Sequence, residues 1–137
     1  MRALITLAIA LLSVSTSADK TLQNIDDLVW KNRLILVWSN NIAASKQQLK
    51  LEAVEVEDRD IIWFLFSESD VATNYQGELT EEFTESAKQF FQSTDNQVVL
   101  IGKDGRVKER DSQMLLDSLF RKIDRMPMRI NEMERYD

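Results

Sequence analysis

Hydrophobic residues gather in two unbroken runs near the middle of the chain, RLILVW at residues 33–38 and DIIWFLF at residues 60–66. Both runs are rich in branched and aromatic residues, which is typical of strands that helices cover on both faces. Between them, apolar residues recur at helical spacing and predict a helix from Ala43 to Asp58. This order predicts a parallel pair of strands joined by a right-handed crossover.

The second half of the chain predicts a helix, a hairpin and a final helix. Apolar positions from Leu79 to Phe91 recur every three or four residues, as on one face of a helix. The stretch QVVLIGKDGRVKER, residues 97–110, predicts a β-hairpin, because Asp104 and Gly105 tolerate the positive φ of a tight turn. The last helix is expected to begin near Ser112.

The predicted elements follow the order β-α-β-α-β-β-α. A parallel pair, a helix and a terminal hairpin sealed by a final helix describe the thioredoxin-like layout of the α/β class, here with a mixed four-stranded sheet. The stretch FSESDVATNYQGE, residues 66–78, is expected to form a loop between the second strand and the next helix.

A single proline, Pro127, interrupts the helical pattern of the last segment. Proline has no amide hydrogen to donate to the carbonyl of Ile123, and its ring crowds that carbonyl. The residue before a proline is also displaced from helical angles, so the helix is expected to end or kink at Met126. Ile130 and Met133 continue the apolar face, which we expect to fold back against the sheet or the hairpin.

The first 18 residues have the composition of a secretory signal peptide. Arg2 supplies a positive charge, residues 3–12 form an apolar segment, and residues 13–18 supply the small residues that a signal peptidase needs. The apolar segment is shorter than the roughly 20 residues that span a bilayer, and no other apolar run is long enough. We expect cleavage after Ala18 and one secreted or periplasmic domain over residues 19–137; the alternative for the first segment is a core or membrane-anchor helix.

The chain contains no cysteine and no histidine. Thiol–disulfide exchange and thiol-based peroxide reduction need a thiolate, so both reactions are excluded. Without histidine the chain lacks the commonest general base near neutral pH, the usual zinc ligand and any Ser-His-Asp triad. Gly102 and Gly105 belong to the predicted hairpin and form no phosphate loop. The sequence therefore indicates no catalytic residue, no cofactor and no metal site.

Charge is distributed unevenly along the chain. Residues 19–97 carry 15 acidic and 7 basic side chains, and residues 98–137 carry 8 acidic and 9 basic ones. Nucleic acid is therefore not an expected partner, because phosphate binding depends on clustered bases. Acidic residues concentrate near the second strand, where we interpret them as solvated surface, with a cation site as the alternative. These residues are Glu55, Glu57, Asp58, Asp60, Glu68 and Asp70.

Three residues at the end of the first strand are candidate partner contacts. Trp38 ends that strand and is interpreted as a core residue or as the lining of a shallow pocket. Asn40 and Asn41 follow, and we expect them to cap the next helix, whose free amides could alternatively hold an anion or a peptide carboxylate.

A second group of candidate contacts lies on the final helical segment. Arg121, Arg125 and Arg129 form a modest basic strip beside an acidic body. Glu132 follows Arg129 by three positions, a spacing that allows the two side chains to pair on an exposed turn. We interpret these four residues as a surface that contacts another protein.

Two C-terminal stretches, LIGKDGRVKER and IDRMPMRINEM, resemble the domain of unknown function 4174, a thioredoxin-like family related to peroxiredoxins. The stretches WKNR and DRD, which precede the two apolar strands, fit the same pattern. The resemblance implies a thioredoxin-like fold and export, because relatives include small exported bacterial proteins and modules of animal extracellular matrix and sushi-repeat proteins. It implies no reaction. The matching residues are Trp30 to Arg33, Asp58 to Asp60, Leu100 to Gly105, Val107, Lys108, Arg110, Ile123, Asp124, Met126 to Arg129, Glu132 and Met133.

These observations predict an exported thioredoxin-like domain that binds an unknown protein or small ligand in the cell envelope without catalysing thiol redox chemistry. One alternative is a non-redox, cation-assisted enzyme that uses the acidic Asp58–Asp70 region. A second alternative is a scaffold protein of the envelope. The sequence does not indicate the oligomeric state.

Overall fold

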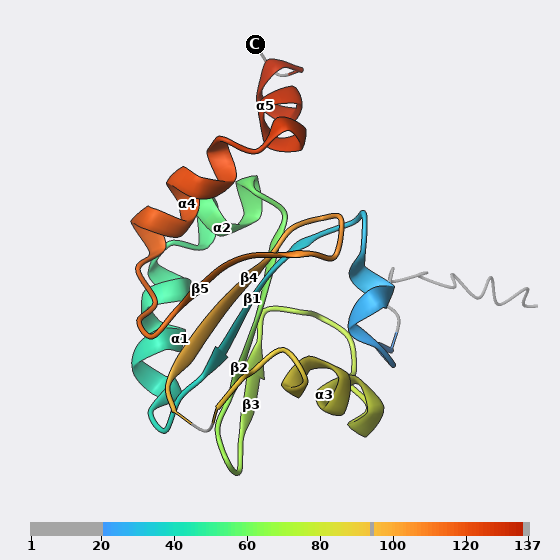
Figure 1. Ribbon diagram of the computed structural model, residues 1–137, viewed down its shortest axis with the longest axis vertical. Helices are drawn as coiled ribbons and strands as arrows, with labels where there is room; N and C mark the ends of the chain where they lie inside the picture. The colour runs from blue at the N-terminus through green and yellow to red at the C-terminus, as the bar shows by residue number, and fades with distance from the viewer. Residues whose placement is uncertain (1–20, 94, 136–137) are drawn as a thin grey trace, which may run out of the picture.

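The computed structural model describes residues 21–93 and 95–135. The predicted signal peptide, with its expected cleavage after Ala18, lies outside the described residues. Five strands form one mixed sheet in the order β3-β2-β1-β4-β5, with helices on both faces (Figure 1). The predicted α/β class is confirmed, although the sheet has five strands rather than four.

The two apolar runs form the centre of the sheet. β1 (Arg33–Trp38) and β2 (Ile61–Phe66) pair in parallel, as predicted. β4 (Gln97–Ile101) pairs antiparallel with the other edge of β1, and β5 (Val107–Asp111) completes the hairpin. β1 and β2 are covered on both faces, which explains their continuous hydrophobic sequences.

The turn of the hairpin depends on a glycine. Gly105 has a φ of 80°, in the left-handed region that glycine adopts without a steric penalty. Its amide donates to the carbonyl of Gly102 at 3.0 Å, and the Gly102 amide donates to the carbonyl of Arg106 at 2.9 Å. The predicted turn at Asp104 and Gly105 is confirmed.

Helices cover the two faces of the sheet unequally. α1, α2 and α4 lie on one face, α3 and the short 3-10 helix η1 lie on the other, and α5 lies beyond one end of the sheet (Figure 1). The bounds are η1 Ile25–Leu28, α1 Ile42–Leu51, α2 Ala53–Asp58, α3 Glu81–Lys88, α4 Leu116–Asp124 and α5 Pro127–Glu134.

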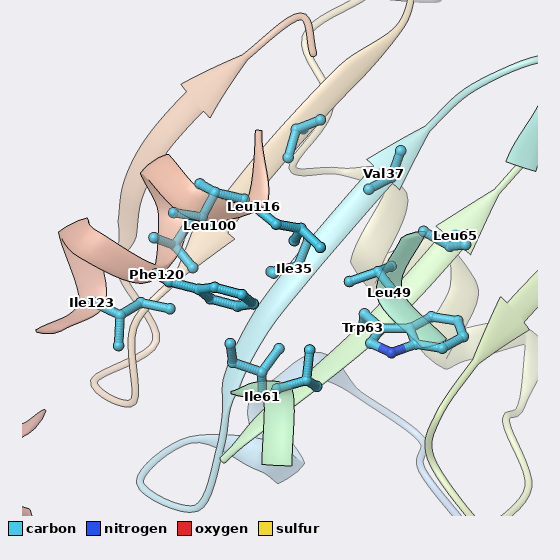
Figure 2. Packing of buried hydrophobic residues seen from close by; sticks show 13 residues of the cluster. Ile35, Val37, Leu49, Ile61, Trp63, Leu65, Leu100, Leu116, Phe120 and Ile123 are labelled. Atoms are coloured by element: carbon cyan, nitrogen blue, oxygen red, sulfur yellow. The ribbon is translucent and has the colours of Figure 1, made fainter. Parts of the chain in front are cut away.

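Alternate side chains of the strands enter two separate apolar cores. Ile35 and Trp63 pack with Phe120 of α4 in the core beneath α1, α2 and α4 (Figure 2). On the opposite face, Phe64 packs against Phe83 of α3 with ring centroids 4.8 Å apart. The central strands of the sheet are therefore buried on both faces.

β3 (Val71–Thr73) forms within the stretch predicted to be a loop. Its three residues pair antiparallel with Phe64 to Phe66 at the edge of β2. The Asn74 side chain extends this edge, because Oδ1 accepts from the Trp63 amide at 2.9 Å and Nδ2 donates to the Ile61 carbonyl at 3.1 Å. Three residues give too short an alternation for a sequence pattern to predict.

The helix predicted from Ala43 to Asp58 is two helices. α1 ends at Leu51 and α2 begins at Ala53, with Glu52 at φ −102° and ψ 25° between them. Leu51 and Val54 are 79% and 78% exposed, so the buried face is interrupted at this junction.

The predicted break at Met126 is confirmed. α4 ends at Asp124, Met126 has an extended ψ of 138°, and Pro127 is the first residue of α5, where a missing amide hydrogen has no intrahelical partner to lose. The apolar face that could fold back does so only in part, because Met133 is half-buried whereas Ile130 is 38% exposed. Arg129 is the buried residue of α5, so charged contacts attach this helix.

Candidate functional site

Four stretches that are far apart in the sequence meet at one end of the sheet. They are the segments before β1 and β2, the turn of the β4–β5 hairpin, and the junction of α4 and α5 (Figure 1). Their charged side chains form connected ion pairs, which we call the charge network. Its members are the cations Arg33, Arg59, Lys103 and Arg129 and the carboxylates Glu55, Asp58, Asp60, Asp124 and Glu132.

Glu132 of α5 faces three cations in this network. Arg33 donates from Nη1 to Oε2 at 3.1 Å and from Nη2 to Oε1 at 3.2 Å. Lys103 Nζ donates to Glu132 Oε1 at 2.6 Å and to Asp60 Oδ2 at 2.8 Å. Arg129 Nη1 lies 3.7 Å from Glu132 Oε2. One carboxylate thereby connects α5 to β1 and to the hairpin.

Asp124, the last residue of α4, binds two arginines. Arg59 donates to it from Nε at 3.0 Å and from Nη2 at 2.8 Å, and Arg129 donates from Nε at 3.2 Å. Arg129 also donates to the Asp58 carboxylate and, at 2.9 Å, to the Asp58 carbonyl. The Arg59 guanidinium lies 4.6 Å from the centroid of the Phe120 ring, a cation–π contact. These contacts fasten α4 and α5 to the segment before β2.

The two central carboxylates remain ionised despite their burial. Burial alone would raise the pKa of Asp124, but hydrogen bonds and charge from its two arginine partners hold that pKa below its usual value. Burial likewise opposes ionisation of Glu132, and the hydrogen bonds from Arg33 and Lys103 outweigh it and lower the pKa. Asp124 and Glu132 therefore carry their negative charge near neutral pH.

The cations of the network are more deeply buried than its carboxylates. The side chains of the four cations are 1–10% exposed, whereas those of the five carboxylates are 20–62% exposed. Water screens charges near the surface more strongly than charges in the interior. Water therefore screens the cations of the network less than their carboxylate partners.

A pocket of about 360 Å³ is lined in part by two cations of the network, Arg33 and Lys103, and we call it the Trp30 pocket. This volume falls within the range of sites for small molecules, roughly 300–1,000 Å³. Its lining combines apolar side chains with charged ones. The lining residues are Trp30, Arg33, Gly102, Lys103, Asp104, Lys108, Met126, Pro127 and Met128.

Trp30 has an unusual backbone for a bulky residue. Its φ is 68°, its side chain is 66% exposed, and its amide donates to the carbonyl of Lys103. A left-handed conformation costs a residue with a Cβ about 1–2 kcal/mol. Among residues 21–93 and 95–135, positive φ at a non-glycine residue occurs at Trp30 and at Asp60, whose φ is 52°. Both lie at this end of the sheet, and such strain tends to occur where function requires it.

Gly102 leaves room for the Lys108 side chain, and both residues line the Trp30 pocket. A Cβ added at Gly102 would lie 2.6 Å from Lys108 Cε, closer than two such atoms can approach. The Lys108 ammonium donates to Asp104 Oδ2 at 2.7 Å. The hairpin thus contributes a partly buried lysine to the lining of the pocket.

The candidate contacts Trp38, Asn40 and Asn41 lie at the opposite end of β1. Trp38 is half-buried, packs 6.0 Å from the Phe91 ring, and lines a shallow pocket beside Lys88, whose Nζ is 5.8 Å from the ring. Trp38 therefore packs against the core and also lines a shallow pocket, the two roles considered from the sequence. Asn41 occupies the N-cap position of α1, as predicted, but its side chain makes no capping hydrogen bond. Asn40 is exposed.

The predicted basic strip does not form one surface. Arg121 and Arg125 are exposed, whereas Arg129 is buried between two carboxylates. Glu132 lies near Arg129, as the spacing predicted, but in the buried network and not on an exposed turn. The physical reason is that the break at Pro127 turns this part of α5 toward the sheet.

Sequence reasoning missed the residues that organise the site, Trp30, Arg33, Arg59 and Lys103. Arg33 opens an otherwise apolar strand and is 1% exposed. A charged residue within an apolar run is a detectable signal, because arginine is almost never fully buried without a partner. No local pattern predicts that its partner is Glu132.

The acidic residues near β2 have different surroundings. Glu55 accepts from Arg59 at 2.7 Å, and Asp58 and Asp60 belong to the charge network. Glu57, Glu68 and Asp70 are exposed, as predicted for solvated surface. Within the part of the chain that the structure describes, no group of three or more acidic side chains is placed to hold a metal ion.

The strand order and the hairpin define a thioredoxin-like α/β domain, and the chain has no cysteine. A family model described as a domain of unknown function (DUF4174) matches residues 24–132. The chain therefore belongs to this family, and the resemblance of its motifs is confirmed. The match includes all four stretches that meet at the charge network.

Two solved structures are similar to this chain at low sequence identity. Thioredoxin peroxidase I of Plasmodium yoelii is 15% identical, with 82% of this chain and 80% of that chain covered and a TM-score of 0.51. The reduced 2-Cys peroxiredoxin of Plasmodium vivax is 16% identical, with coverage of 82% and 85% and a TM-score of 0.48. The first likeness confirms the thioredoxin-like class and carries no statement about activity.

No curated protein matches the chain. None of the helices over residues 21–93 and 95–135 has the length and hydrophobicity that crossing a bilayer requires.

Proposed function

We propose that this protein is an exported binding domain that holds a ligand in the Trp30 pocket and performs no thiol chemistry. The observation that supports the proposal best is the exposed Trp30, kept in a left-handed conformation at the wall of a pocket that also contains buried cations. Ligand sites typically combine an apolar lining with a few convergent polar groups.

The other end of the sheet offers weaker support for binding. Residues 38–41 are Trp, Ser, Asn and Asn, which supply neither a thiolate nor an imidazole. The pocket beside Trp38 is lined by exposed or half-buried residues and contains no buried charge. A charge taken out of water interacts more strongly with a ligand than an exposed one does, which favours the Trp30 pocket.

Export is supported by the pattern of the first 18 residues. N-terminal sequencing of protein recovered from the periplasm or the medium is expected to begin at Asp19. A mature chain that begins at Met1 or Arg2 would contradict export through a cleaved signal.

A cation-assisted enzyme finds less support in the geometry. The Asp58 and Asp60 carboxylates bind Arg129 and Lys103, so a metal ion would have to compete with those cations. Addition of calcium or manganese is expected to leave the melting temperature unchanged, whereas a rise that depends on metal concentration would support the enzyme. An envelope scaffold would copurify with other envelope proteins and show no response to small molecules.

The binding proposal is tested by thermal denaturation of the purified protein with a chemically diverse set of fragments. Ligands of the native state raise the melting temperature in proportion to RT ln(1 + [L]/Kd). Fragments that stabilise the wild type are expected to lose their effect in Trp30→Asn and keep it in Asn40→Ala, a matched change at the other end of β1. Hits that survive Trp30→Asn, or no hits at all, would contradict the proposal.

A further inference from the structure

We infer that the ligand of the Trp30 pocket is a small organic carboxylate, an apolar body with one anionic head group. This inference rests on the proposed function and adds the chemical class of the ligand. It depends on three features: a buried hydrogen-bond donor without an acceptor, a helix N-terminus without a side-chain cap, and a pocket lining that combines apolar side chains with buried cations.

The unpaired donor is Nε of Arg33. This atom is buried, and no hydrogen-bond acceptor contacts it among the described residues. The two Nη atoms of Arg33 are already engaged by Glu132 and by the carbonyl of Arg59. Buried donors are nearly always satisfied in folded proteins, so this exception calls for an acceptor. Arg33 is one of the residues that line the Trp30 pocket, and we infer that a ligand bound there supplies the acceptor.

The helix end is the first turn of α5. Met126 precedes the helix without a capping hydrogen bond from its side chain, and the first turn carries no carboxylate. The amides of this turn have no partners within the helix, and the helix dipole adds positive potential there. Pro127 and Met128 line the pocket, so the end of α5 adjoins it and favours an anion.

Two cations of the pocket are more deeply buried than the carboxylates that bind them. Arg33 and Lys103 are 1% and 10% exposed, whereas Glu132 and Asp60, which bind them, are 20% and 50% exposed. Lys108 adds a third cation, paired with Asp104. The pocket lining therefore contains three cations and one carboxylate, Asp104, and this net positive charge favours an anionic head group.

Another part of the pocket lining favours a ligand with an apolar body. Trp30, Met126, Pro127 and Met128 form it, and Trp30 and Met128 are 66% and 39% exposed. Flexible thioether and flat indole side chains adapt to apolar molecules of varied shape. A bare inorganic anion would leave this part of the lining uncovered, and a neutral apolar molecule would leave the Arg33 donor unsatisfied.

Isothermal titration calorimetry with 4-phenylbutanoate, its neutral amide 4-phenylbutanamide, and acetate tests this inference. The carboxylate is expected to bind at least tenfold more tightly than either the amide or acetate. Lys108→Gln is expected to weaken the carboxylate by about tenfold and to leave the amide unchanged. Lys122→Gln is the matched control, because Lys122 also pairs with a carboxylate, Glu109 at 3.0 Å, but lies outside the pocket.

The outcomes separate this inference from the proposed function. Equal binding of the amide and the carboxylate, lost in Trp30→Asn, would overturn the anionic head group while leaving a binding pocket in place. Equal binding of acetate would overturn the apolar body. Absence of 4-phenylbutanoate binding, with other fragments still bound at the pocket, would overturn the ligand class, and failure of every fragment would overturn the proposed function as well.

Discussion

Arg33 and Glu132 are 99 residues apart in the sequence, yet two hydrogen bonds of 3.1 and 3.2 Å join their side chains. This pair connects the first residue of β1 to the last turn of α5. It therefore fixes α5 at the end of the sheet, where the helix forms one wall of the Trp30 pocket.

Loss of Arg33 is expected to destabilise the fold strongly. Arg33→Met removes a side chain that is 1% exposed and leaves the partly buried Glu132 with fewer cations. Removal of one partner from a buried pair typically costs about 3 kcal/mol or more. Urea denaturation should show that loss, whereas Arg121→Met, a change at an exposed arginine, should cost less than about 0.5 kcal/mol. Equal effects of the two changes would contradict the structural role of the pair.

Acid is expected to weaken the network through Glu132. Its pKa is lowered in the folded state by Arg33 and Lys103 against the opposing effect of burial. A carboxylate whose pKa is lower in the folded state than in the unfolded state stabilises the fold at pH values above its unfolded pKa, which is about 4.3 for glutamate. This stability is lost as the pH falls through the pKa of the folded state. The melting temperatures of wild type and Glu132→Gln should therefore converge as the pH falls below about 4.3.

The control for this titration is Glu134→Gln, which changes an exposed glutamate of the same helix. Its curve is expected to follow that of the wild type across the whole pH range. Parallel curves for wild type and Glu132→Gln would show that the Glu132 carboxylate adds no stability through its ionised form.

Pro127 is expected to contribute less to the position of α5 than the contacts of Arg129 with Asp58 and Asp124. Pro127→Ala should cost about 1 kcal/mol or less, since its main effect is greater freedom of the unfolded chain. Arg129→Met removes three hydrogen-bonding contacts with Asp58 and Asp124 and should cost about 3 kcal/mol. A gain of helical circular dichroism in Pro127→Ala, as if α4 and α5 had fused, would contradict this ranking.

Trp30 is expected to matter for binding and not for stability. Trp30→Asn places at φ 68° a residue that tolerates the left-handed region, and this gain offsets the packing that the indole loses. The free energy of unfolding should stay within about 1 kcal/mol of the wild type while ligand binding disappears. A large loss of stability would show that the strained tryptophan serves the fold.

The sequence predicts the fold because its patterns are local. The apolar runs of β1 and β2, the glycine of the hairpin and the break before Pro127 each follow from neighbouring residues. The site depends on contacts that are not local. Arg129 has the spacing of an exposed helical residue and is buried because its partners come from other elements, so no periodicity reveals it.

The most direct test is a ¹⁵N–¹H correlation spectrum of the labelled protein during addition of the fragment set, observed at the three tryptophan indoles. Trp30 lines the proposed pocket, Trp38 lies at the other end of β1, and Trp63 is buried in the core. We predict that bound fragments shift the Trp30 indole signal and leave the other two in place. Shifts confined to Trp38, or no shift with any fragment, would contradict the binding site proposed for this protein.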